Sequence, residues 1–314
     1  MALTNSASGA CRFLGLLPRI EQLIQMNGHS FKSLDDLQMA TWDSFGASDN
    51  QLKLVRQFFE FWLKSELWLC TGNGVELNPR YGSGSFGSRL AKWLVNKAST
   101  ERLFTSTDAE SVVRAACVVM SVDGFTPRTI KPISDKEIEK SLNRQMPDES
   151  NHLDRDLVDP MAKSISLLTN NTNELKPTIQ WLSIIGILEP GPSENTWYIN
   201  PARLLKTFLP DIAKELGVNK VVPITKFLSV LAQCIPMVDG GKFFELVSRA
   251  RIRSGFQPND TKQIGSALSA GLYSLQAQRL LQFKLLSDDK NRCVLSPDYF
   301  GRRDEISSVE ILNV

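Results

Sequence analysis

The sequence predicts a mainly α-helical fold with small β-hairpins, organised as three tandem modules that are joined by bracing helices. One pattern, a helix followed by two short apolar strands and a closing Asn-Pro or Ser-Pro, recurs three times in the 314 residues. Two further stretches of amphipathic helical periodicity precede each copy. Hydrophobic residues make up 42% of the chain and charged residues 22%, which is the composition of an ordinary globular protein.

The three hairpins define the repeat. Each contains two short apolar stretches around a turn rich in Gly, Asn, Asp or Ser, the residues that reverse a chain. Asn73-Gly74 in the first turn is a strong two-residue hairpin signal. Each second strand ends before a proline, which has no N–H group to donate to a ladder. The strands are expected near residues 67–77, 187–199 and 284–295.

A helix with a recognisable start precedes each hairpin. Capping boxes at Ser48, Asn171 and Asp260 mark these starts. Two earlier helices complete each module, at 12–26 and 33–41, at 107–121 and 134–145, and at 223–234 and 240–253. Two further helices, at 88–98 and 202–216, are expected to brace neighbouring modules. One more helix is expected near 159–169, as an insertion in the second module.

The order helix, helix, helix, hairpin resembles the winged helix-turn-helix superfamily. The resemblance implies three winged-helix-like modules, at residues 1–82, 106–217 and 218–300. A linker helix at 83–105 separates the first two modules, and a polar C-terminal tail follows at 301–314. The second module departs from the pattern, because the acidic stretch 146–158 separates its second and third helices. We expect this stretch to be a surface loop. His152 lies among its carboxylates, so a divalent metal site is the alternative.

Motifs of catalysis and cofactor binding are weak or missing. The five cysteines form no C-x-x-C pair and there are two histidines, so a zinc site is not expected. Gly82-x-Gly84-x-x-Gly87 matches the dinucleotide fingerprint, but that fingerprint requires a βαβ unit, and here the preceding strand belongs to a hairpin. No Walker A, G-x-S-x-G or H-E-x-x-H motif occurs. We therefore expect no catalytic residues, no metal and no cofactor, and a protein that is not an enzyme.

A cytoplasmic location is expected. No apolar run reaches the roughly 20 residues that a membrane helix needs. The N-terminal residues lack the basic head and apolar core of a signal peptide, since Arg12 and Arg19 flank a short apolar part. Contact with a membrane is therefore not expected.

Charge indicates the third module as the part that binds nucleic acid. Residues 101–200 carry 10 basic and 15 acidic side chains, whereas residues 201–314 carry 16 and 11, a net charge of +5. In DNA-binding winged helices the third helix enters the major groove and the wing often contacts phosphate. Here that helix presents hydroxyl and amide groups that suit base edges. The predicted nucleic-acid-binding residues are Lys242, Arg249, Arg251, Arg253, Lys262, Ser266, Ser269, Tyr273, Gln276, Lys290 and Arg292.

The first two modules suit protein partners better than nucleic acid. The first hairpin turn has no basic residue, and Glu189 and Glu194 in the second wing would repel phosphate. The favoured function is a non-enzymatic, nucleic-acid-associated adaptor subunit of a multiprotein complex, with double-stranded DNA bound through module three.

Other functional classes remain open. A pure protein–protein scaffold is the alternative, because tandem winged-helix subunits of chromosome-condensing complexes clamp a partner chain and resemble this plan. An enzyme is the third class. The overall layout also resembles winged-helix accessory proteins of bacterial phage-defence or DNA-modification islands, such as the DpdG family, which implies a role in antiviral defence.

Overall fold

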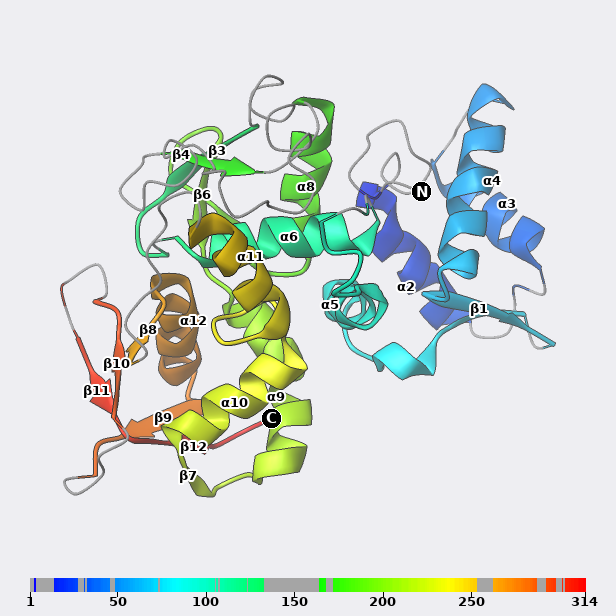
Figure 1. Cartoon of the computed structure of the whole chain (residues 1–314). Coiled ribbons are helices and arrows are strands. Elements are labelled where there is room, and N and C mark those ends of the chain that lie inside the picture. The colour runs from blue at the N-terminus through cyan, green and yellow to red at the C-terminus, as the bar shows by residue number, and fades with distance from the viewer. Residues whose placement is uncertain are drawn as a thin grey trace.

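The computed structural model shows a mainly helical molecule with small sheets (Figure 1), which confirms the predicted fold class at this level. It describes residues 3, 14–27, 31, 33–45, 49–72, 74–104, 106, 108–122, 124–132, 164–167, 172–252, 262–286, 292–297, 301 and 303–314. In Figure 1 the first helices and the first hairpin lie to one side of a larger body that the later elements form.

The first module has the predicted order of three helices and a hairpin. Its elements are η1 (Leu14–Leu16), α2 (Leu17–Asn27), α3 (Leu34–Phe45), α4 (Asp49–Lys64), β1 (Trp68–Thr71) and β2 (Gly74–Leu77). β1 and β2 pair antiparallel, with Thr71 opposite Gly74. Trp62 on α4 and Trp68 on β1 are fully buried, and their ring centres lie 6.4 Å apart. The hairpin therefore closes the core of this module.

Trp62 also joins the first module to its neighbours. Its ring centre lies 5.6 Å from that of Trp93 on α5 (Phe86–Lys97) and 5.9 Å from that of Trp181 on α8 (Thr172–Ile184). The indole N–H of Trp181 donates a hydrogen bond to the carbonyl of Leu3 at 2.8 Å. Three tryptophans thus pack as core residues, which is the usual role of large aromatic side chains.

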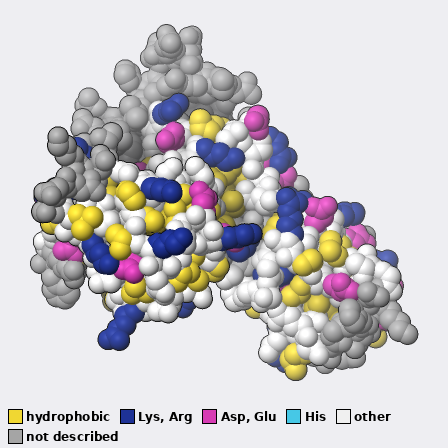
Figure 2. Space-filling view, turned by 90° about the horizontal axis from the view of Figure 1, so that it is seen from below, with side chains coloured by type: hydrophobic (Ala, Val, Ile, Leu, Met, Phe, Trp, Pro, Cys, Tyr) yellow, Lys and Arg dark blue, Asp and Glu magenta, His cyan; other side chains and the backbone are white. Residues whose placement is uncertain are grey.

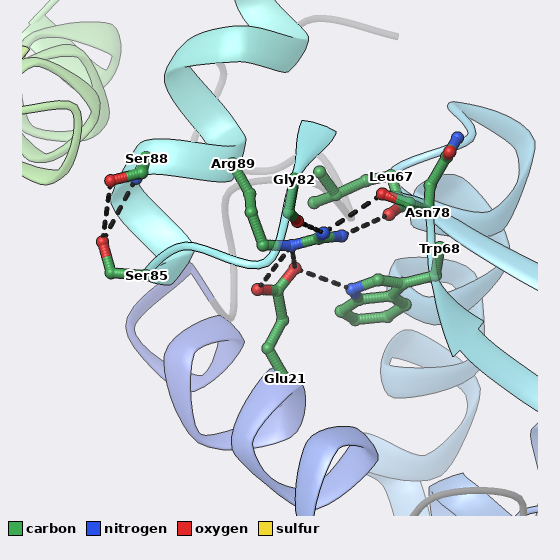
Figure 3. A network of polar contacts seen from close by, with 8 residues as sticks. All are labelled: Glu21, Leu67, Trp68, Asn78, Gly82, Ser85, Ser88 and Arg89. Carbon is green, nitrogen blue, oxygen red and sulfur yellow. Dashed lines mark hydrogen bonds and ion pairs between the residues drawn. The ribbon is translucent and has the colours of Figure 1, made fainter. Parts of the chain in front are cut away.

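A buried ion pair fixes α5 against α2 (Figure 3). Nε of Arg89 lies 3.2 Å from Oε2 of Glu21, and neither side chain is more than 2% exposed. Trp68 donates its indole N–H to the same carboxylate. The guanidinium also donates to three backbone carbonyls, those of Leu67, Asn78 and Gly82. Burial raises the pKa of Glu21, and the attraction of Arg89 offsets only part of that rise.

The glycine-rich stretch before α5 has a structural role. The preceding strand, β2, belongs to an antiparallel hairpin, and η3 (Pro79–Tyr81) follows it. Oγ of Ser85 accepts a hydrogen bond from the N–H of Ser88 and so caps α5. A Cβ at Gly87 would lie 2.4 Å from the carbonyl oxygen of Ile184, so this glycine allows α5 to approach the end of α8.

The second module contains its predicted hairpin and two strands that the sequence did not predict. Its elements are α6 (Ala109–Met120), β3 (Arg128–Pro132), β4 (Ser164–Leu167), α8, β5 (Leu188–Pro190) and β6 (Thr196–Ile199). β5 pairs antiparallel with β6, which confirms this hairpin, and β3 pairs antiparallel with β6 and parallel with β4. The helix predicted near 159–169 is wrong at 164–167, where the alternation Ser-Ile-Ser-Leu suits a strand. The predicted helix at 134–145 and the acidic loop at 146–158 lie outside the described residues.

The predicted second brace and the helices of the third module lie close to their predicted places. They are α9 (Ala202–Leu216), α10 (Ile224–Cys234), α11 (Lys242–Ile252) and α12 (Ser266–Ala277), with the short strands β7 (Val221–Pro223) and β8 (Gln263–Ile264) between them. α9 has the predicted bounds. α12 begins at Ser266 rather than at the predicted capping box, because the residues just before it extend into β8.

The third predicted hairpin is wrong. Its strands form, as β9 (Leu281–Lys284) and β10 (Cys293–Leu295), but they pair with others. β9 pairs antiparallel with β12 (Ser308–Ile311), whereas β10 pairs parallel with β8 and antiparallel with β11 (Glu305–Ile306). The predicted polar tail is therefore wrong too. Val309 and Ile311 are fully buried, and this apolar alternation makes β12 the central strand of the sheet β7-β12-β9.

Candidate nucleic-acid interface

α12, the predicted recognition helix, is largely a core helix. Its buried residues are Ala267, Leu268, Ser269, Ala270, Gly271, Leu272 and Leu275. A Cβ at Gly271 would lie 2.7 Å from Cγ of Pro201 and 2.8 Å from Cδ1 of Leu205. Small residues thus let α12 pack directly against the start of α9, which leaves little of its surface for a DNA groove.

The serines of α12 are engaged within the protein. Oγ of Ser266 accepts a hydrogen bond from the N–H of Gly124 at 3.1 Å. Ser269 is fully buried, donates to the carbonyl of Ile264 and accepts from the N–H of Ser296. This hydroxyl joins β8 to the end of β10, and in this position it is not accessible to a base edge.

Tyr273 and Gln276 lie farther along α12 and are half-buried. The Tyr273 ring centre lies 6.2 Å from that of Phe125, and its hydroxyl accepts a hydrogen bond from the N–H of Asp304. The carbonyl of Gln276 accepts from the N–H of Arg279 in the turn that ends the helix. Tyr273 therefore connects α12 to the second module and to the segment before β11.

The basic residues of α11 form the more accessible part of the predicted interface. The Arg249 side chain is 74% exposed, and its Nη2 lies 3.5 Å from the carboxylate of Glu245, one turn earlier. Arg251 is the next to last residue of α11, but its side chain lies outside the described part, as does the whole of Arg253. Exposed ion pairs of this kind are weak, so the Arg249 guanidinium can still engage a phosphate.

Lys242 opens α11 and is exposed. Its ammonium lies 5.0 Å from the centre of the Phe243 ring. A shallow cavity of about 440 Å³ lies beside it, between α10 and α11, and polar side chains from Ser229, Gln233 and Glu245 help to line it. The lining therefore combines the Lys242 cation with the Glu245 carboxylate, and the hydroxyl and the amide add neutral hydrogen-bonding groups.

The remaining predicted residues lie near β8 and β10. Lys262 is exposed just before β8. Nη1 of Arg292 lies 3.6 Å from the carboxylate of Glu305 on β11, which partly neutralises it. Lys290 lies outside the described residues.

Asp239 is a positioning residue that sequence reasoning missed. Its carboxylate accepts a hydrogen bond from the N–H of Gly265, directly before α12, at 2.9 Å. Burial raises the pKa of Asp239, and the N–H groups of Gly265 and Gly240 lower it in part. The sequence pointed to Asp260 for this capping role. Asp239 has no local spacing to α12, so only the tertiary fold reveals it.

Exposed cations on α9 and α10 were also missed. The sequence placed both helices but assigned α9 to bracing. The sequence of α9 does indicate an exposed basic face, because basic residues recur on the side opposite its apolar residues. The exposed basic residues of this region are Arg203, Lys206, Lys214, Lys220 and Lys226.

Within the part of the chain that the structure describes, no helix combines the length and the apolar character needed to cross a bilayer. In the same residues, no three His, Cys, Asp or Glu side chains gather as metal ligands would. The described cysteines are free thiols, at Cys70, Cys117, Cys234 and Cys293.

Comparison with known proteins identifies the family. The family model described as DpdG-like matches residues 1–289. Comparison with curated proteins and with solved structures gave no match. The resemblance to the DpdG family that the layout suggested is thus confirmed. Because the match covers most of the 314 residues, the chain belongs to the DpdG-like family.

Proposed function

We propose that this chain is a non-enzymatic, nucleic-acid-associated adaptor in a bacterial DNA-modification or phage-defence system. Membership of the DpdG-like family is the observation that carries the proposal, since the layout resembles accessory proteins of such systems. We also propose that the repeated helix and hairpin units are winged-helix modules, with the first two binding protein partners and the third contributing cations for phosphate. Exposed side chains such as Lys242 and Arg249 support this last role.

A protein scaffold without nucleic-acid binding is the second candidate. The packing of α12 favours it, because the hydroxyls of Ser266 and Ser269 already bond within the protein. A scaffold that clamps a partner chain needs no exposed recognition helix. Both candidates lack a catalytic step, so the isolated protein should show no nuclease, ATPase or hydrolase turnover.

Copurification separates these candidates. The tagged chain is purified from its native cell with and without nuclease treatment. Partners that are lost after nuclease digestion support nucleic-acid association. Partners that remain unchanged favour the scaffold and contradict the adaptor proposal.

Charge reversal at Arg249, Arg251 and Arg253 tests the predicted cations. Changing Arg249, Arg251 and Arg253 to Glu should weaken binding to every duplex sequence and reduce its salt dependence, because phosphate contacts release counterions. Lys176→Glu on α8 is the control, since acidic residues in the neighbouring wing already disfavour phosphate there. A triple variant that binds DNA like the parent but loses a protein partner would assign these arginines to a protein interface.

A further inference from the structure

We propose that the exposed side of α9 and α10 is the principal surface for the phosphate backbone of double-stranded DNA. We call it the α9–α10 surface, and it consists of Arg203, Lys206, Lys214, Lys220 and Lys226. This inference rests on the proposed nucleic-acid association and names the surface that carries it. It also moves the main contact away from α12, whose polar side chains are engaged within the protein.

The cations of α9 lie opposite its buried face. Leu205, Leu209 and Ile212 are among the residues of α9 that pack into the core. Around a helix with 3.6 residues per turn, Arg203, Lys206 and Lys214 fall on the other side. A well-packed helix therefore holds Lys206 and Lys214 at fixed positions in solvent, and the guanidinium of Arg203 also donates a hydrogen bond to the carbonyl of Ser183 at 2.7 Å.

Lys220 and Lys226 extend the charged surface towards α10. A Cβ at Gly217 would lie 2.6 Å from Cδ of Lys220, so the stem of this lysine folds back over the end of α9. Lys226 is exposed on the first turn of α10, which packs against α9. Figure 2 looks onto this side of the molecule from below and shows Lys and Arg side chains distributed across it, more often than Asp and Glu on the C-terminal body.

These five cations differ from several other described basic residues, which form ion pairs with carboxylates. Among the described residues, none of the five has a carboxylate within ion-pair distance. By contrast, Lys97 pairs with Glu66 and Lys284 with Glu310. Of the two carboxylates of α9, Asp211 is engaged by Lys92 at 2.7 Å, which leaves Glu215 as the other. The surface therefore keeps a net positive charge.

Helix stability does not explain where Lys226 lies. A helix N-terminus carries partial positive charge, so it favours carboxylates and disfavours cations. Yet the first turn of α10 contains Lys226 and no acidic residue. Arg203 lies in the first turn of α9, but its guanidinium donates a hydrogen bond to the carbonyl of Ser183 near the end of α8, so it also has a structural role. The placement of Lys226 costs helix stability, which is consistent with selection for an anionic partner.

The spacing and the neighbours favour a duplex over a single strand. Lys206 and Lys214 are eight residues apart on one helix, a separation of about 12 Å at 1.5 Å per residue, close to the width of the DNA major groove. Single-strand binding uses exposed aromatic rings on which bases stack. Among the described residues, Phe104 is the one large aromatic side chain that is exposed, and it does not lie on α9 or α10.

The test measures binding of the full chain to a fluorescent 20-base-pair DNA duplex over a series of salt concentrations. Five phosphate contacts predict a log–log slope of about −4.5, from roughly −0.9 per contact. Changing Lys206, Lys214 and Lys226 to Ala should flatten the slope by about 2.7 and lower affinity at 0.1 M salt by about 100-fold or more. The matched control changes Arg19, Lys64 and Lys176 to Ala, which removes the same charge from exposed positions on α2, α4 and α8.

The outcomes separate this inference from the proposed function. Parent protein that binds neither this duplex nor a duplex of different sequence contradicts both. Parent protein that binds duplex and loses equal affinity in both variants contradicts the α9–α10 surface alone. If duplex does not bind but an acidic polypeptide binds the parent and not the α9–α10 variant, the surface is a protein interface and the inference is wrong. Unchanged thermal unfolding of both variants confirms that folding is not the cause.

Discussion

At the scale of single residues, Arg89 shows how a charge can be stable inside this molecule. Its guanidinium has lost all contact with water, and Glu21 and three carbonyls replace the hydration. The two residues are far apart in the sequence and belong to no shared periodic pattern. Sequence reasoning could therefore place both on helices but could not predict that they pair.

Removing Arg89 should be among the most damaging changes in the first module. Arg89→Met leaves the Glu21 carboxylate buried without its cation, which costs about 3–5 kcal/mol of unfolding free energy. Urea unfolding measures this loss. Arg56→Met is the control, because Arg56 and Glu60 form an exposed pair at 3.3 Å whose loss costs about 0.3–0.5 kcal/mol. Equal losses of unfolding free energy in the two variants would show that the buried pair stabilises the fold no more than the exposed pair does.

The pH dependence of stability should reveal how Glu21 titrates. Burial raises its folded-state pKa above the ordinary value of 4.5, so the folded chain binds this proton more tightly than the unfolded chain does. The stabilisation that the protonated Glu21 contributes is fully present below the pKa of the unfolded state and is lost as pH rises through the pKa of the folded state. The parent should therefore lose stability relative to Glu21→Gln as pH rises from about 4.5. The opposite trend in paired urea titrations would mean that attraction to Arg89 outweighs the desolvation of the carboxylate.

At the scale of elements, α9 and α12 show what sequence patterns can and cannot determine. α9 has a continuous apolar stripe and Gly217 directly after its last turn, and these local signals predicted its bounds. α12 carries serines and a tyrosine that suggested an exposed polar face. That face instead packs against β8, β10 and the second module, because Gly124 and Gly271 allow close approach. Such contacts depend on which elements meet, and local periodicity does not encode that.

Gly124→Ala should loosen the contact between the second module and α12. The new Cβ would lie 2.8 Å from Cα of Ala267 and 2.9 Å from the carbonyl oxygen of Ile199. Backbone atoms cannot rotate away, so overpacking should cost about 1–3 kcal/mol. Gly15→Ala serves as the comparison, since its Cβ would meet nothing within 4 Å. Thermal unfolding curves that coincide for the two variants would contradict this account of the interface.

At the scale of the whole molecule, the three predicted modules pack against one another. Leu3 contacts Trp181 through a hydrogen bond, and Oγ1 of Thr207 on α9 lies 3.0 Å from Oγ of Ser88 on α5. The first two hairpins were visible in the sequence because their strands are adjacent in the chain. The prediction of the third hairpin was wrong because a turn signal does not specify the partner of a strand, and β12 supplies a better apolar match for β9.

Replacing Ile311 should test the role of β12 in this assembly. Ile311 is fully buried in the central strand, so Ile311→Ala should cost about 2–5 kcal/mol in urea unfolding. Val314→Ala should change stability by less than about 0.5 kcal/mol, because Val314 is 60% exposed. If both variants unfold like the parent, the residues from 301 onward behave as the tail that the sequence predicted.

The central position of β12 also has a consequence for synthesis on the ribosome. β7 is translated long before β12, the strand that pairs with both β7 and β9. Until β12 emerges, β7 presents unpaired backbone groups, which are templates for pairing with other chains. β9 lies close to β12 in the chain and leaves the ribosome together with it. Nascent chains of this protein are therefore expected to need either rapid completion or chaperone protection at this stage. Slowing translation between β9 and β12 should increase aggregation, whereas an equal delay before β7 should not.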